Sequence, residues 1–167
     1  REYLGTWQLT RVICCAVDVD MYVVENAAAA RLAYEASRFD YGACNVPETL
    51  PDLSFSGFRV LHAQNGGGEA ELAIFQGASF YRAVARGQNL GVTARALSIR
   101  TADPRGEEFP AFRSFWIEKP ALSDNALVIH ALLDSPSVAG VYRFTLRPGE
   151  ATLIDTELTL YPRTAVD

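Results

Sequence analysis

From Ser54 onward, the chain is divided into short runs rich in Val, Ile, Leu, Phe, Tyr and Thr. Each run has eleven residues or fewer, as β-strands do, and the breaks between runs hold Gly, Pro, Asn and Asp, which form tight turns. No amphipathic helix of useful length falls between the runs. The predicted strands are Gly57–His62, Glu71–Phe75, Ser79–Arg86, Gly91–Arg100, Arg113–Glu118, Ala126–Leu133, Gly140–Leu146 and Ala151–Tyr161.

This succession of strands indicates an all-β fold. Strands that follow one another without crossover helices pair antiparallel, so we predict an antiparallel β-sandwich or a large curled sheet. The chain is 49% hydrophobic and 21% charged, which is typical of a globular protein. No linker or repeat divides it, so residues 1–167 are interpreted as one domain or part of one.

The N-terminal third is less regular. Asp20–Glu25 and Arg31–Tyr34 are predicted to form a hairpin with a turn of small residues, although the alanines between them also suit a helix. Tyr41–Leu53 has the composition of an extended connector, and Arg1–Ala16 shows no clear alternation. We therefore assign no element to that first segment.

Charge and cysteine content exclude several classes of function. The net charge of −5 argues against nucleic acid, which binds clustered Lys and Arg. No apolar run approaches the roughly 20 residues of a membrane span. Cys14, Cys15 and Cys44 favour free thiols, with a bridge to Cys44 as the alternative, and no metal-ligand spacing accompanies them. We expect neither a metal nor a cofactor.

A series of short motifs gives a more specific signal. They occur in the same order and with similar spacing in the periplasmic glucan biosynthesis proteins of the G and D types, which this chain resembles from Val19 to Arg163. The main motifs are FQGASFYR at Phe75–Arg82, ARGQ at Ala85–Gln88, ARALSI at Ala94–Ile99, GEEFP at Gly106–Pro110, FWIEKP at Phe115–Pro120, ALLDSPS at Ala131–Ser137 and LYPR at Leu160–Arg163.

The resemblance implies both an architecture and a compartment. Members of this family are several times longer, with an export signal, a β-sandwich domain of galactose-mutarotase-like shape and a smaller immunoglobulin-like domain. The chain would then be a partial domain, whose partners include the missing remainder of that sandwich and the immunoglobulin-like domain. The implied location is the periplasm, although no export signal is found within the chain.

The resemblance also implies a substrate, a glucan with a β-1,2-linked backbone. Some members resemble inverting endo-β-1,2-glucanases, which need two carboxyl groups about 6.5–9.5 Å apart. The aspartates proposed for that role in the family lie beyond the position of Arg163. We therefore assign no catalytic residue here and leave open whether the protein is an enzyme. The alternatives are a non-catalytic carbohydrate-binding β-sandwich and a truncated remnant without function.

Two adjacent carboxylates, Glu107 and Glu108, are the most visible acidic pair. They lie on a loop bounded by Gly106 and Pro110, and loops on a rigid β scaffold often carry function. Neighbouring side chains of an extended segment point to opposite sides, so they suit each other poorly as acid and base. We favour a structural role, in which one of them pairs with an arginine. Contact with a sugar is the alternative.

Aromatic and basic residues complete the candidate substrate-binding set. Trp116, with Tyr81 and Phe115, could form a sugar platform, although a tryptophan on a strand is more often part of the core. Arg82 and Arg95 lie inside predicted strands, where a buried arginine needs a partner. We favour structural ion pairs with Glu118, Asp134 or Asp155, and keep a grip on ligand hydroxyls as the alternative. A further expectation is a packed His130.

Overall fold

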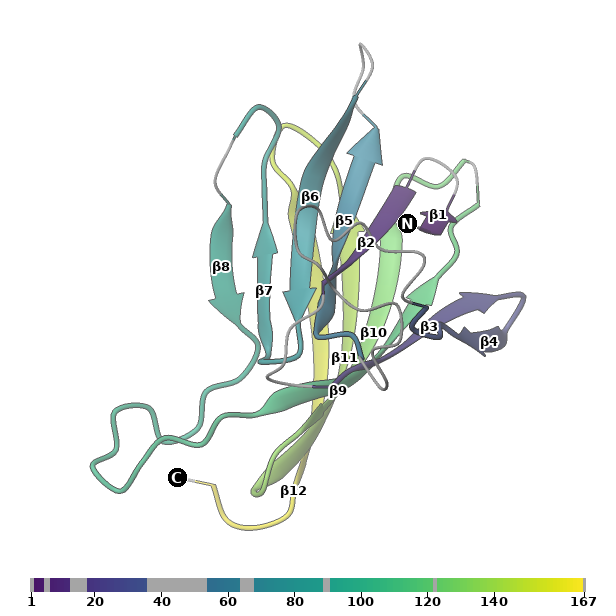
Figure 1. Ribbon diagram of the computed structural model, residues 1–167. Helices are drawn as coiled ribbons and strands as arrows, with labels where there is room; N and C mark the ends of the chain where they lie inside the picture. Colours follow the sequence, from purple (N-terminus) through teal and green to yellow (C-terminus); the bar gives the residue numbers. More distant parts are fainter. Residues whose placement is uncertain are drawn as a thin grey trace, which may run out of the picture.

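The computed structural model describes residues 2–4, 7–12, 18–35, 54–63, 68–88, 91–121 and 123–166, the first two segments by their backbone alone. In these residues the chain forms two sheets of six strands each, packed face to face with their core between them (Figure 1). The described part of the chain contains strands and no helix. The predicted all-β fold is confirmed, and its two layers fit a β-sandwich.

One sheet, which we call the first sheet, is entirely antiparallel. Its neighbours follow the order β1-β2-β5-β6-β7-β8. The strands are β1 (Glu2–Leu4), β2 (Trp7–Val12), β5 (Gly57–Ala63), β6 (Glu69–Gln76), β7 (Phe80–Ala83) and β8 (Val92–Arg95).

The other sheet, the second sheet, contains one parallel pair. Its order is β12-β11-β10-β9-β3-β4, and β3 runs parallel to β9 while every other pair is antiparallel. The strands are β3 (Asp20–Glu25), β4 (Ala28–Arg31), β9 (Ala111–Glu118), β10 (Leu127–Asp134), β11 (Val138–Arg147) and β12 (Leu153–Pro162). The predicted antiparallel pairing is therefore confirmed for every pair except β3 with β9.

All eight strands predicted after Ser54 exist, with shifted ends. β7 and β8 are shorter than expected. β7 begins only at Phe80, because Ser79 lies in a turn with φ 58°, and β8 ends at Arg95. β1 and β2 were not predicted at all. They have no clear alternation in sequence, and β2 is recognised as a strand only by its pairing with β5.

The predicted hairpin near the N-terminus also exists, but its second strand is misplaced. The alanines that were expected to form the turn are the strand β4, and the turn itself is Asn26-Ala27. Both turn residues have positive φ, 51° and 62°, which is the arrangement of a type I′ hairpin turn. Helix propensity at these alanines is overridden by the pairing of β4 with β3. The three cysteines and the connector 41–53 lie outside the described residues.

Aromatic rings from both sheets form the core. Phe58 and Phe75 of the first sheet stack at 5.3 Å, and Phe115 of the second sheet meets Phe58 edge-on at 5.1 Å. Phe144 packs against Phe75 at 5.1 Å. Each such pair contributes about 0.5–1.5 kcal/mol beyond the burial of its area, so this cluster fixes how the two sheets face each other.

A β-bulge in β9 changes which side chains reach this core. Strict alternation would place Arg113, Phe115 and Ile117 on one face. The pairing with β10 slips between Leu132 and Leu133, which leaves Arg113 as an extra residue. Arg113 is therefore exposed, while Phe112 and Phe115 are both fully buried.

Candidate functional site

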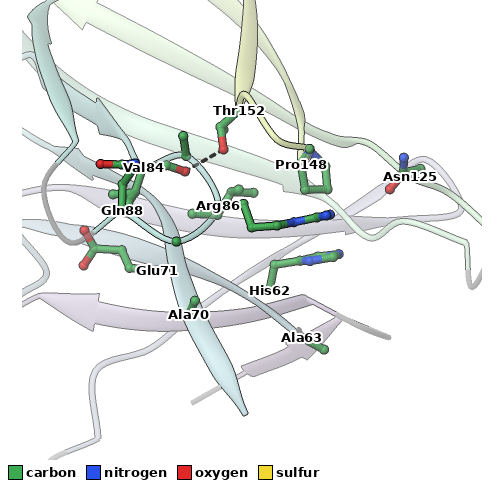
Figure 2. A pocket seen from close by; sticks show the side chains of 14 residues that line it. His62, Ala63, Ala70, Glu71, Val84, Arg86, Gln88, Asn125, Pro148 and Thr152 are labelled. Carbon is green, nitrogen blue, oxygen red and sulfur yellow. Dashed lines mark hydrogen bonds between the residues drawn. The ribbon is translucent and has the colours of Figure 1, made fainter. Parts of the chain in front are cut away.

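A cavity of about 660 Å³ opens at one end of the sandwich (Figure 2). The ends of β5 and β7 and the start of β6 line it from the first sheet, and the residues between β11 and β12 close it from the second. Thr152 Oγ1 donates a hydrogen bond of 2.5 Å to the Val84 carbonyl and so ties the two sides together. This volume falls within the range of small-ligand sites, about 300–1,000 Å³.

The polar groups of the cavity come from short local features of the chain. His62 is the next-to-last residue of β5. Arg86 and Gln88 lie in a tight turn after β7, closed by a 3.1 Å hydrogen bond from Gln88 N–H to the Ala85 carbonyl. Gly87 has φ 72° in that turn, a conformation that glycine adopts without strain.

His62 and Arg86 lie side by side in this cavity. Figure 2 shows the imidazole and the guanidinium extending in the same direction, while the Glu71 side chain extends in the opposite direction. Burial lowers the pKa of His62 from its usual value of 6.5, and the nearby Arg86 charge lowers the pKa further, against a hydrogen bond at Ala63 that raises it. His62 is therefore neutral at pH 7, able both to donate and to accept a hydrogen bond.

Several of the lining groups are available to a ligand. Within the described ranges, no hydrogen bond or ion pair engages the Arg86 guanidinium or the side-chain amides of Gln88 and Asn125. Glu71 is held differently, because Arg82 donates a hydrogen bond to it and Arg59 lies 3.9 Å away. The cavity thus offers unengaged donors and acceptors beside a fixed carboxylate.

Two of the candidate residues, Tyr81 and Trp116, do not form a common platform. Tyr81 faces inward, with its ring 5.2 Å from Phe144 and 5.9 Å from Phe75. Trp116 lies on the outer face of the second sheet, half-buried, and stacks on Tyr22 at 5.3 Å. The Trp116–Tyr81 platform is therefore wrong, since the residues belong to different sheets, and Trp116 lies outside the core as well.

Arg82 and Arg95 form structural ion pairs, as we favoured, but with other partners. Arg82 binds Glu71, and Arg95 binds Glu107. The Arg95 guanidinium also lies 5.4 Å from the Phe80 ring centre and 5.2 Å from that of Phe109. The expected partners contact other basic side chains. Glu118 contacts His130, Asp134 binds Arg163, and Asp155 binds Arg147.

The two neighbouring glutamates point to opposite sides, as expected. Glu107 reaches Arg95, whereas Glu108 accepts hydrogen bonds from the hydroxyls of Ser135 and Ser137 at 2.6 and 2.5 Å. Arg100 lies 3.5 Å from Glu108. The structural interpretation of this pair is confirmed, and these contacts use the Glu108 carboxylate fully.

His130, expected to be packed, is only half-buried and lies 2.6 Å from Glu118.

The residues of the cavity were missed by sequence reasoning. In the sequence, His62 appears only as the end of a predicted strand, and Arg86 and Gln88 only as part of the ARGQ motif. Asn125 and Thr152 carried no signal, since they are brought to the cavity by the second sheet. The one usable hint was the glycine turn at the end of a strand, a common place for binding residues.

Comparison with known proteins places this β-sandwich in a family. The sequence model of the periplasmic glucan biosynthesis protein family, MdoG, matches residues 8–167. The chain belongs to this family. It is similar to glucans biosynthesis protein G of Shewanella sp. (strain ANA-3) and to glucans biosynthesis protein G 1 of Shewanella oneidensis, each 50% identical over 148 residues. These alignments cover 87% of the chain and 27% of each relative.

The chain therefore spans about a quarter of the length of the curated relatives that it matches. The earlier resemblance to this family is confirmed. Within the described residues, no helix is long and apolar enough to cross a membrane.

Proposed function

We propose that this chain is the portion of a periplasmic glucan biosynthesis protein that binds the β-glucan, in the cavity lined by His62, Arg86, Gln88 and Asn125. The substrate class comes from the family and from the names of the relatives. The supporting observation is the polar cavity of about 660 Å³, in which Arg86, Gln88 and Asn125 present unengaged hydrogen-bonding groups. A neutral polyhydroxylated ligand matches such a lining, because each hydroxyl both donates and accepts.

The carboxylate content of the cavity supports binding of the glucan by this portion rather than its cleavage. Among the described residues that line it, Glu71 alone carries a carboxylate, and Glu71 is paired with Arg82. Hydrolysis with inversion requires two carboxyl groups on opposite sides of the glycosidic bond. Any catalytic pair would then include residues from elsewhere in the protein, which agrees with our assigning no catalytic residue.

Calorimetric titration of the full chain with short β-1,2-linked gluco-oligosaccharides tests the proposal. Arg86→Ala removes a charged donor, worth about 1.5–3 kcal/mol, so we expect affinity to fall by about tenfold or more. Arg105→Ala is the matched control, because Arg105 lies on the remote loop before β9 and binds Asp103. Unchanged affinity in Arg86→Ala, or no heat of binding in the unmodified chain, would overturn the proposal.

A further inference from the structure

A single row of side chains crosses the second sheet on its outer face. The strand pairing aligns Tyr22 with Trp116, Trp116 with His130, and His130 with Arg143. Arg31 and Glu157 extend this row to the two edges of the sheet. The neighbours of Trp116, His130 and Arg143 along their strands are buried, and so is Met21 beside Tyr22. Side chains alternate along a strand, so the row faces away from the core.

The centre of this row is aromatic. Tyr22 and Trp116 are half-buried and stack nearly parallel, with an interplanar angle of 9°. Each ring covers part of one face of the other and fixes its orientation, so the ring surface that stays uncovered needs no rearrangement to bind. Uncovered aromatic ring surface packs against the C–H groups of a pyranose ring, while the groups around it meet the hydroxyls.

Carboxylates accompany the basic side chains of the row. Arg31 binds Asp20, His130 Nε2 lies 2.6 Å from Glu118 Oε1, and Arg143 Nη1 donates to Glu157 Oε1 at 2.6 Å. Each of the row's basic side chains thus has a carboxylate beside it. A surface of this kind offers hydrogen bonds with little net charge, and so matches a neutral ligand better than an anionic polymer.

We propose that this row is a second carbohydrate-binding surface, on which a neutral glucan chain lies across the strands. Neighbouring strands are about 4.8 Å apart, so six strands present a track of about 24 Å, long enough for several sugar units. The track lies along the outer face of a sheet, whereas the cavity is a recess at one end of the sandwich. The row would therefore favour polymer over short oligosaccharide. The choice of glucan as the polymer rests on the proposed function.

Tryptophan fluorescence reports on this surface directly. The chain has two tryptophans, so Trp7→Phe leaves Trp116 as the single emitter. We expect linear β-1,2-glucan to shift or quench that emission. Arg143→Ala, a substitution at an exposed residue that should not disturb folding, should weaken polymer binding several-fold. Trp116→Ala removes that emission, so its polymer affinity is measured by calorimetric titration, and it should be about tenfold weaker, as after loss of a central aromatic contact. Arg105→Ala should leave it unchanged.

The outcomes separate this inference from the proposed function. If Arg86→Ala abolishes the calorimetric signal of oligosaccharides while Trp116 emission still responds to polymer, both sites stand. If oligosaccharides do not bind but Trp116 responds to polymer, only the cavity proposal fails. If oligosaccharides bind and Trp116 emission stays constant with polymer, the row is not a binding surface. Emission that follows protein concentration instead of glucan would assign the row to a second copy of the chain and overturn the inference.

Discussion

The hydroxyl of Ser135 donates a hydrogen bond of 2.6 Å to Glu108, and this contact joins the turn after β10 to the long loop that precedes β9. Ser137 adds a backbone and a hydroxyl hydrogen bond to the same carboxylate. From the other side, Arg163 binds Asp134 at 2.7 Å and donates to the Ser135 carbonyl. Three sequence motifs that are far apart in the chain thus meet at one end of the second sheet.

Replacement of Glu108 should therefore destabilise the fold. Glu108→Gln removes the charge that three donors share and leaves at least one of them poorly matched, in a site where the Glu108 side chain is 5% exposed. We expect a loss of about 1–3 kcal/mol in the free energy of unfolding, measured by urea denaturation. Glu107→Gln is the control, and should cost about 1 kcal/mol or less because its ion pair with Arg95 is partly exposed. Equal losses in the two variants would contradict this role.

The same contacts predict how stability responds to acid. Hydrogen bonds from Ser135 and Ser137 hold the pKa of Glu108 below its usual value of 4.5. The stabilisation is complete above that value, and is lost as pH falls below it, because the unfolded chain takes up the proton first. In Glu108→Gln, the fall in melting temperature between about pH 5 and pH 3 should be shallower than in the unmodified chain. Identical slopes would argue that other carboxylates dominate the response.

His62 should make a separate contribution at higher pH. Its pKa is lowered in the folded chain, so the unfolded chain takes up a proton first as pH falls below about 6.5. Stability should therefore decrease just below that value, and the decrease should be absent in His62→Gln. Oligosaccharide affinity should be constant from pH 7 to pH 8 and fall once His62 becomes charged beside Arg86. An affinity that increases on acidification would contradict a neutral His62 in the cavity.

The β3–β4 turn offers a stabilising substitution. Ala27 has φ 62°, a left-handed conformation that costs a residue with a Cβ about 1–2 kcal/mol. Ala27→Gly relieves this strain and produces the Asn-Gly pair that type I′ turns prefer. After the entropy that glycine adds to the unfolded chain, we expect a net gain of about 0.5–1 kcal/mol by urea denaturation. Ala29→Gly, inside β4, should instead lose about that amount.

The edge strand β12 should make the isolated chain self-associate. Leu158 and Leu160 align with Tyr142 and Gly140, whose side of the sheet faces the core, yet they remain 41% and 40% exposed. Among the described strands, β12 pairs on one side only, and such edges invite further pairing. Light scattering should show association that increases with concentration and is reduced in Leu160→Lys. A single monomeric species in the unmodified chain would contradict this expectation.

Local sequence patterns predicted the strands but only part of their arrangement. Val, Ile and Phe in short runs identify a strand wherever it pairs, so the strands after Ser54 were found from sequence alone. β2 shows no such pattern, and exists because β5 offers it a partner. The parallel contact of β3 with β9 joins segments about ninety residues apart, which no local periodicity reports.

For the candidate site residues too, local sequence predicted some features and only the tertiary structure decided others. Alternation within one segment predicted that Glu107 and Glu108 would point to opposite sides, and the structure confirms this. The Trp116–Tyr81 platform failed because it required knowledge of which sheet each strand joins.

What the sequence determined by itself was the class of fold and the family, since strand length, turn residues and motif order are properties of neighbouring positions. Only the tertiary structure decided that the bulge turns Arg113 outward, that Arg86 lies beside His62, and that Tyr22 lies beside Trp116. The physical reason is that register and sheet order minimise the free energy of the whole chain. A shift of one residue would exchange the core face of a strand with its outer face.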